Sequence, residues 1–345
     1  MTRDAQEPEL LLPARPGSTR VARTEKRAET MALSPSPYSP APFEGLLAFP
    51  LTPFTADLCL DLHAFSQNVE RHIEAGAGAL FVACGTGELS SLSPAEHAAV
   101  LARAREVARG RVPVWVGAGG GAAGARAAVA AAAEGGADGV LLLPPYLVAG
   151  PPSGLVDFAR YAVGDTSVPV IVYHRSPGVF TPKAAVSLLD VPSVVGLKDG
   201  YGDVELMHRI VAAVRGVGTE RAERFLFFNG LPTAEVSAHA YQAIGVARYS
   251  SAVHCFAPEI AHRFHRALAE GDQRVTQALL HGFYLPFVAL RDETPGFAVS
   301  LVKAAARLRG DVTGPVRPPL VGPGPEQIER LRHIVEDGHR VLKEL

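Results

Sequence analysis

The sequence predicts an α/β protein that folds as a closed (β/α)₈ TIM barrel with a helical C-terminal region. From residue 45 onward, short apolar runs alternate with alanine-rich helical patterns. Continuous apolar strands alternating with helices are typical of a parallel sheet covered on both faces. Eight such units occupy roughly 230 residues, which matches a barrel of this kind in number and size.

The predicted elements follow one another in strict alternation along the chain. We expect strands over residues 45–51, 79–83, 114–117, 139–143, 168–173, 194–198, 225–228 and 246–250. We expect the helices between and after them over 62–75, 95–109, 122–135, 154–163, 182–189, 203–215, 233–243 and 258–270.

Three further helical patterns follow the eighth unit, over 273–290, 297–308 and 325–344, and a stretch rich in Pro and Gly at 310–325 interrupts them. We therefore expect the barrel over 43–271 and a helical region packed on it over 272–345.

The N-terminal 42 residues differ in composition from the rest of the chain. Residues 34–42 are rich in Pro and Ser, a composition that favours extended, solvated chain. The only apolar run, Leu10 to Leu12, is too short for the core of a signal peptide. We expect residues 1–42 to be mostly disordered. Met31 is an alternative to Met1 as the start of translation.

Composition excludes several classes of protein. The chain has 345 residues, 48% of them hydrophobic, and a formal net charge of −2, which argues against a dedicated nucleic-acid binder. Cys59, Cys84 and Cys255 are too few and too scattered for a disulfide framework, and a reducing cytoplasm fits them best. No apolar run reaches the ~18 residues of a membrane span. We expect a cytoplasmic protein without nucleic-acid or membrane partners.

A glycine-rich run at 117–122 raises the alternative of a doubly wound dinucleotide-binding sheet. It fits G-x-G-x-x-A loosely, but Asp138 precedes the next strand, whereas the fingerprint needs an acidic residue at that strand's end. The other interpretation is a tight turn where backbone passes close to backbone or substrate.

Polar and small residues follow the predicted strands. Because the active site of such a barrel lies at the carboxyl ends of its strands, we expect these residues to converge on one mouth. No strand end combines histidines and carboxylates as a catalytic metal site would, and His262 and His265, on a predicted helix, are typical of surface residues. The strand ends are 50–54, 84–90, 144–146, 173–175, 198–200, 229–230 and 249–251.

Lys198 is the most informative of these residues because it ends a buried apolar run. Burial disfavours a charged amine, which favours the neutral nucleophile that a Schiff-base enzyme requires. The alternative is a lysine with a buried stem and its head group in water.

The other strand-end residues have both a structural and a chemical interpretation. The loop 85–87 could be only a turn, or its backbone N–H groups could bind a carboxylate. Tyr173 could be a core aromatic, or its hydroxyl could reach a substrate held on Lys198. Glu88 is expected to be structural. Asp199 is expected to point away from the mouth, since neighbours on a strand alternate faces.

These residues, in this order and spacing, resemble the Schiff-base aldolase and dehydratase superfamily of dihydrodipicolinate synthase and N-acetylneuraminate lyase, over about residues 44–310. The resemblance implies that Lys198 forms the imine and that Tyr173 transfers protons. It implies that Thr86, with the backbone at Gly85 and Gly87, binds the carboxylate beside the ketone.

The resemblance also implies further properties of the site. Ser250 and Asn229 are weaker candidates for contacts with substrate hydroxyls or the distal carboxylate. No metal or organic cofactor is needed, since the iminium itself is the electron sink.

Within that superfamily, seven segments resemble the 5-dehydro-4-deoxyglucarate dehydratases, which release water and CO₂ to form 2,5-dioxopentanoate. Leu147 and Gly178 replace a tyrosine and an arginine of dihydrodipicolinate synthase, which supports this choice. His174 stands where these dehydratases usually have Asn. The segments are 49–54, 85–88, 143–147, 198–200, 230–235, 249–252 and 314–320.

The resemblance implies a hydro-lyase for a small keto sugar acid, assembled as a homotetramer or homodimer. Two alternatives stay open. The same residues could run an aldol cleavage of a 2-keto-3-deoxy sugar acid that releases pyruvate. The chain could also be a non-catalytic keto-acid-binding barrel, against which the pairing of Lys198 with Tyr173 argues.

Overall fold

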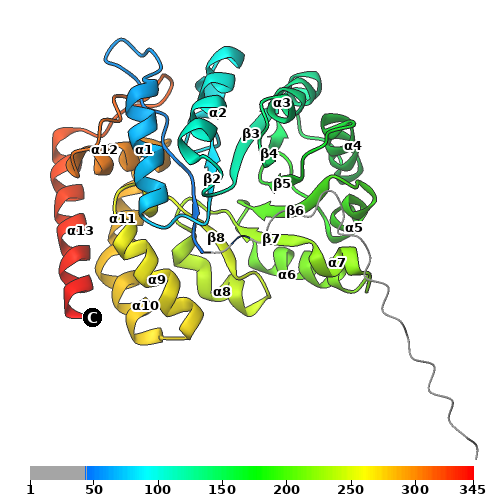
Figure 1. Cartoon of the computed structure of the whole chain (residues 1–345). Helices are drawn as coiled ribbons and strands as arrows, with labels where there is room; N and C mark the ends of the chain where they lie inside the picture. The colour runs from blue at the N-terminus through cyan, green and yellow to red at the C-terminus, as the bar shows by residue number, and fades with distance from the viewer. Residues whose placement is uncertain (1–42, 44) are drawn as a thin grey trace, which may run out of the picture. The chain divides into compact units, whose positions relative to one another are not determined.

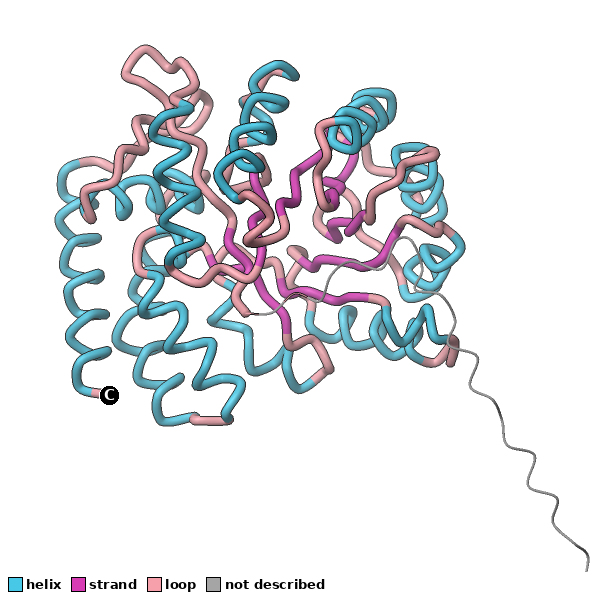
Figure 2. The backbone as a smooth tube through the Cα atoms, viewed as in Figure 1, coloured by secondary structure: helices cyan, strands magenta, loops and turns pink. Residues whose placement is uncertain are grey.

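Eight parallel strands close into a barrel in sequence order, with β1 paired to both β2 and β8. The computed structural model describes residue 43 and residues 45–345. The expected disorder of residues 1–42 and the choice between Met1 and Met31 lie outside that range. Helices surround the ring of strands (Figures 1 and 2), so the predicted TIM barrel is confirmed.

Each predicted strand is present, with small differences in its ends. The first strand is much shorter than expected, since Pro50 has no N–H group for the ladder. The strands are β1 (Leu47–Ala48), β2 (Ala79–Val82), β3 (Val114–Gly120), β4 (Gly139–Pro145), β5 (Val170–His174), β6 (Val194–Asp199), β7 (Leu226–Asn229) and β8 (Arg248–Ser251).

The predicted barrel helices are also present. Several begin at a residue whose side chain accepts a hydrogen bond from the first turn, as Asp61, Thr181 and Asp203 do. The helices are α1 (Leu62–Glu74), α2 (Pro94–Ala108), α3 (Ala122–Glu134), α4 (Pro152–Val163), α5 (Pro182–Ser187), α6 (Val204–Arg215), α7 (Glu220–Arg224), α8 (Ala238–Ala243) and α9 (Pro258–Glu270).

Short 3₁₀ turns and one extra helix account for the remaining differences. The helix expected over 233–243 begins as the turn η3 (Ala234–Ser237) and continues as α8, and α7 was not expected. The other 3₁₀ turns are η1 (Leu89–Ser91), η2 (Leu188–Asp190) and η4 (Val253–Cys255).

Successive residues along each strand pack in two different apolar clusters, one outside the barrel and one inside it. Val116, Val140 and Leu197 pack outward against the helices. The barrel interior is filled by a second cluster that consists mainly of aromatic and branched side chains. That cluster contains Phe43, Leu47, Phe49, Ala79, Phe81, Cys84, Trp115, Leu141, Ile171, Tyr173 and Phe228.

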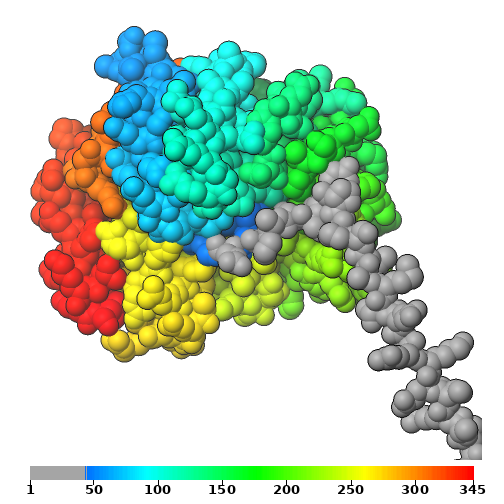
Figure 3. All heavy atoms as spheres, in the orientation of Figure 1, coloured from blue at the N-terminus to red at the C-terminus, as the bar shows by residue number. Residues whose placement is uncertain are grey.

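The C-terminal helices share an apolar core with α9. Phe264 of α9 packs in one cluster with Phe283, Phe287 and Leu331, and the red atoms of the C-terminal helix lie against the yellow atoms of the preceding helices in the space-filling view (Figure 3). The single helix expected over 273–290 is divided by a π turn, and the other two are as predicted. These elements are α10 (Gln273–Leu279), η5 (Leu280–Tyr284), α11 (Leu285–Arg291), α12 (Phe297–Leu308) and α13 (Pro325–Glu344).

None of the helices in the described part of the chain has the length and apolar character needed to cross a membrane.

Candidate active site

Lys198 and Tyr173 meet inside the barrel. They are register partners on β6 and β5, and the Lys198 Nζ lies 4.1 Å from the centroid of the Tyr173 ring. Both donate a hydrogen bond to the carbonyl oxygen of Gly230, at 3.1 Å from Lys198 Nζ and 2.9 Å from the Tyr173 hydroxyl. Lys198 is only 6% exposed, so the alternative of a head group in water is wrong.

Two glycines make room for this pair. A Cβ atom at Gly230 would clash with the amine of Lys198, and a Cβ at Gly200 would lie 2.5 Å from the Tyr173 hydroxyl. Contacts this short require a shift of backbone or side chain. Any larger residue at either position would therefore displace the amine or the phenol.

The electrostatic surroundings of Tyr173 favour proton transfer. Burial by itself raises the pKa of its phenol, but the positive charges of Lys198 and Arg175 outweigh burial and lower the pKa below its usual value of 10. A phenol with a lowered pKa is a better acid and base near neutral pH.

The neighbours of this pair face the opposite way. His174 and Asp199 are register partners one residue further along, and both are buried outside the barrel interior. The His174 Nδ1 accepts a hydrogen bond from the Phe180 N–H at 3.0 Å, and Asp199 accepts one from the Tyr241 hydroxyl. The predicted orientation of Asp199 is confirmed. His174, the departure from the dehydratase pattern, does not reach the mouth.

The loop after β2 is a tight turn. Glu88, which ends it, has a left-handed φ of 55°, and a Cβ at Gly87 would lie 2.9 Å from the Ala83 nitrogen. Thr52 donates its hydroxyl to the Gly87 carbonyl at 2.7 Å. Among residues 45–345, no acceptor takes the backbone N–H groups of residues 85–87, which leaves them available to a carboxylate.

A buried ion pair holds this loop from outside the barrel. The Glu88 Oε1 lies 2.5 Å from Lys303 Nζ of α12, and the two side chains are 1% and 0% exposed. The Glu88 Oε2 accepts the backbone N–H of Arg317 at 3.1 Å, and Lys303 also donates to the Pro315 carbonyl at 2.9 Å. Glu88 therefore has the structural role that the sequence predicted.

Arg317 holds the segment 314–320 against the same loop through hydrogen bonds and an ion pair. Its guanidinium donates to the Ser91 carbonyl at 2.6 Å and forms an ion pair with Glu96, whose pKa it lowers to about 2. It also lies 4.2 Å from the centroid of the Phe54 ring. The sequence identified this segment only by resemblance, because its contacts join residues more than 200 positions apart.

Ser250 and Asn229 differ in where they lie. Ser250 pairs in register with Leu47 of the interior cluster, so it faces the barrel interior. The Asn229 amide instead donates to the Ala234 carbonyl at 3.0 Å and to the Ser237 hydroxyl at 2.8 Å. The structure does not bring Asn229 together with Lys198, because its side chain holds its own loop.

Arg175 is a mouth residue that was not among the candidates. Its guanidinium carbon lies 6.0 Å from the centroid of the Tyr173 ring. The signal in the sequence is its position two residues after Tyr173, since residues i and i+2 of a strand share a face.

Most of the glycine-rich run 117–122 lies within β3, which extends to Gly120, so this part of the chain is a strand and not the expected turn. A Cβ at Gly117 would clash with the Ala83 carbonyl, and one at Gly119 would lie 3.1 Å from the Leu143 Cβ. These glycines let β3 pass close to the end of β2. The expected close approach of backbone to backbone is confirmed, whereas the expected turn is wrong for residues 117–120.

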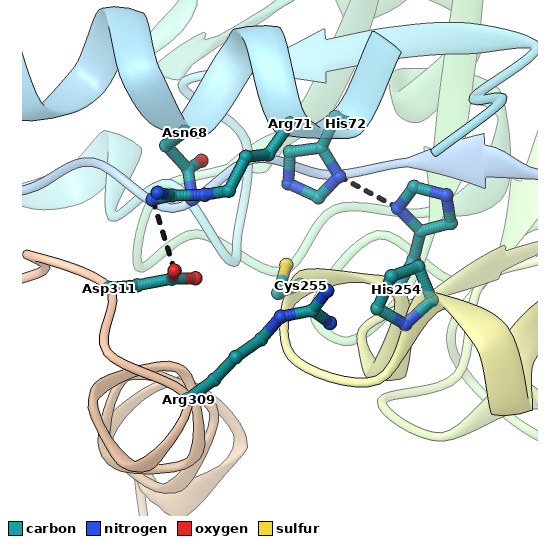
Figure 4. A pocket seen from close by; sticks show the side chains of 8 residues that line it. Asn68, Arg71, His72, His254, Cys255, Arg309 and Asp311 are labelled. Carbon is teal, nitrogen blue, oxygen red and sulfur yellow. Dashed lines mark hydrogen bonds and ion pairs between the residues drawn. The ribbon is translucent and has the colours of Figure 1, made fainter. Parts of the chain in front are cut away.

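A second polar pocket lies outside the barrel interior, between α1 and η4 (Figure 4). The His72 Nδ1 lies 2.7 Å from His254 Nδ1, and the His254 Nε2 lies 3.1 Å from His262 Nε2. An ion pair between Arg71 and Asp311 at 3.2 Å closes the other side. The expectation that His262 is a surface residue is wrong, because it is half-buried and belongs to this chain of imidazoles.

Comparison with known proteins places these features in a family. The model of the dihydrodipicolinate synthetase family matches residues 42–337. A protein of Streptomyces coelicolor named "Probable 5-dehydro-4-deoxyglucarate dehydratase 1" is 52% identical, over 87% of this chain and 94% of its own length. A "Probable 5-dehydro-4-deoxyglucarate dehydratase" of Rhizobium meliloti is 39% identical, over 86% and 96%.

Solved structures show the same fold. Dihydrodipicolinate synthase of Oceanobacillus iheyensis superposes with a TM-score of 0.77 at 22% identity, over 86% of this chain and 96% of that one. The Thermotoga maritima enzyme of the same name superposes with a TM-score of 0.76 at 25% identity, over 86% and 99%.

Removal of the Lys303 charge is expected to destabilise the barrel. Lys303→Met leaves Glu88 as an unpaired buried carboxylate, at a cost of about 3–5 kcal/mol in the free energy of unfolding measured with urea. The double variant Lys303→Met/Glu88→Gln should recover part of this loss. Lys183→Met, on an exposed face of α5, is the control. Equal stability of Lys303→Met and this control would contradict the role of the pair.

The buried histidines are expected to make stability depend on pH. Burial lowers the pKa of His72 to about 3 and that of His254 well below its usual value. The unfolded chain takes up protons below pH ~6.5 that the folded chain does not bind. The contribution of these histidines to the free energy of unfolding is therefore fully present above that pH. As the pH decreases below it, the free energy of unfolding falls by about 1.4 kcal/mol per pH unit for each of the two histidines.

Urea unfolding between pH 7.5 and pH 5 measures this slope. The variant His72→Gln/His254→Gln should flatten it, whereas replacement of the exposed His63 on the same helix should leave it unchanged. An unchanged slope in the double variant would show that these imidazoles do not couple to folding.

Proposed function

The chain belongs to the dihydrodipicolinate synthetase family, and on this basis we propose that it is a Schiff-base lyase that uses Lys198 to dehydrate and decarboxylate 5-dehydro-4-deoxyglucarate. The products are 2,5-dioxopentanoate, CO₂ and water. The observation that carries the proposal is the convergence of Lys198 and Tyr173 on the Gly230 carbonyl, inside the barrel.

The first step is imine formation. The neutral amine of Lys198 attacks the keto carbon, and the carbinolamine loses its hydroxyl as water. Tyr173 is close enough to carry the protons, because its hydroxyl and the Lys198 amine share one acceptor. The Lys198 Nζ lies 5.1 Å from the centroid of the Phe49 ring and 4.1 Å from that of the Tyr173 ring, so the attack takes place in the apolar interior of the barrel.

Dehydration follows from the positive charge of the iminium. The cation acidifies the adjacent methylene, and loss of its proton gives an enamine. The enamine electrons then expel the hydroxyl on the next carbon as water. The result is an iminium conjugated with a carbon–carbon double bond, which extends the electron sink by two carbons.

Decarboxylation uses this extended sink. The bond to the carboxylate far from the ketone breaks, its electron pair enters the conjugated system, and CO₂ leaves. Protonation and tautomerisation then give the aldehyde, and water releases the product from Lys198. The carboxylate beside the ketone remains in the product, held by Thr86 and the backbone N–H groups of the loop 85–87.

We also propose that the protein works in the cytoplasm as a homodimer or homotetramer. The three cysteines are free, two of them are buried, and such thiols suit a reducing compartment.

Borohydride trapping tests the role of Lys198. Incubation with 5-dehydro-4-deoxyglucarate and borohydride should add mass to the peptide that contains Lys198, and the substrate without borohydride should yield CO₂ and the aldehyde. Lys198→Ala should abolish both, whereas Lys183→Ala should retain both. Unimpaired turnover of Lys198→Ala would refute the mechanism. Release of pyruvate in place of CO₂ would identify an aldolase, and no trapping with any keto acid would indicate a binding protein.

Removal of the Tyr173 hydroxyl is expected to slow the reaction while leaving the ring in place. Tyr173→Phe should lower kcat by roughly 10²–10⁴-fold if the phenol is an acid and base of the reaction. Single-turnover rates of imine trapping would locate the loss in the first step. A loss below about tenfold would assign Tyr173 to packing alone.

A further inference from the structure

The proposed substrate carries a negative charge at both ends. This inference rests on the proposed function: the loop 85–87 accounts for the carboxylate beside the ketone but not for the other one. The second carboxylate lies four carbon–carbon bonds of about 1.5 Å each from the keto carbon. A cation for it must therefore stand at the mouth, close to Lys198 but apart from the loop.

Arg175 meets this geometric requirement. It follows the inward-facing Tyr173 by two residues, and its guanidinium carbon lies 6.0 Å from the same ring that Lys198 Nζ approaches to 4.1 Å. Both side chains thus border one aromatic ring, Lys198 from within the barrel and Arg175 at the exposed strand end.

The backbone around Arg175 is well fixed. Its N–H donates to the Gly178 carbonyl at 3.3 Å, and the Gly178 N–H donates back to the Arg175 carbonyl at 2.7 Å. A Cβ at Gly178 would lie 3.0 Å from the Cβ of Pro144, so this short hairpin packs on the end of β4. Arg175 therefore projects from a rigid position at the rim of the mouth.

The other charged and amide groups considered for this role are already engaged, and Ser250, which faces the interior, offers only an uncharged hydroxyl. Lys303 is neutralised by Glu88 and Arg317 by Glu96, and the Asn229 amide is bonded within its own loop. In the part of the chain that the structure describes, no carboxylate lies within ion-pair distance of Arg175. Its guanidinium is free to form the bidentate contact with a carboxylate for which its shape is suited.

We propose that Arg175 binds the carboxylate of the substrate that lies far from the ketone, and that it thereby selects keto diacids over keto acids with an uncharged end.

This role is one of binding and not of acceleration. The carboxylate that Arg175 holds is the one that leaves as CO₂, and an ion pair favours the charged carboxylate over the neutral product. Loss of Arg175 should therefore raise KM for 5-dehydro-4-deoxyglucarate far more than it lowers kcat.

Three keto acids test the proposal by borohydride trapping, without the need for turnover. 2-Oxoadipate has six carbons and carboxylates at both ends, 2-oxohexanoate has the same chain with a methyl end, and pyruvate has only the keto acid head. In the wild type, half-maximal trapping should need about tenfold less 2-oxoadipate than 2-oxohexanoate. In Arg175→Gln this difference in half-maximal concentration should vanish, even where the lost charge beside Tyr173 slows the trapping of all three acids, and Arg175→Lys should retain part of the difference.

Lys183→Gln, which removes an equal charge from α5, is the matched control and should behave as the wild type. An unchanged preference for 2-oxoadipate in Arg175→Gln would overturn the proposal. So would an effect on all three acids that is confined to the rate of trapping and leaves their half-maximal concentrations unchanged, because Arg175 would then act only through Tyr173. If the wild type traps no keto acid, the Schiff-base function fails instead. Calorimetric measurement of the noncovalent binding of 2-oxoadipate and 2-oxohexanoate then still tests the role of Arg175.

Discussion

The carbonyl oxygen of Gly230 accepts hydrogen bonds from both Lys198 and Tyr173, and the candidate site depends on this shared acceptor. It brings an amine and a phenol from two strands to one point directly after the end of a third strand, β7. The arrangement requires glycine at two positions, because side chains at Gly230 or Gly200 would occupy the space of the amine and the phenol. The site is thus made by backbone as much as by side chains.

The alternation of side chains along each strand decides which residues take part in the candidate site. In the closed barrel, residues that share a register level face the same side, so Tyr173 enters the interior with Lys198 while His174 and Asp199 turn outward together. His174 is therefore buried on the outer side of the strand, where it accepts a hydrogen bond from Phe180. By the same alternation, Arg175 lies two residues after Tyr173 and on the same side of the sheet, at the mouth of the barrel.

The loop that faces this pair depends on distant parts of the chain. Glu88 is held by Lys303, and the segment around Arg317 crosses the same loop, so that α12 and its following segment support the proposed carboxylate site. A buried ion pair costs desolvation of both charges, and here the cost is offset by hydrogen bonds on both partners. The C-terminal region therefore contributes to the site without entering it.

The sequence by itself determined the eight strands, the order of helices, the lysine at the end of the sixth strand and the outward direction of Asp199, because each depends on local periodicity. It did not reveal the contacts of Arg317, the chain of buried histidines or the local role of Asn229. Those were decided only by the tertiary structure, since the first two join residues far apart in the chain and the third depends on how one loop closes on itself. Periodicity specifies the face on which a side chain lies, whereas its partners depend on how the barrel closes.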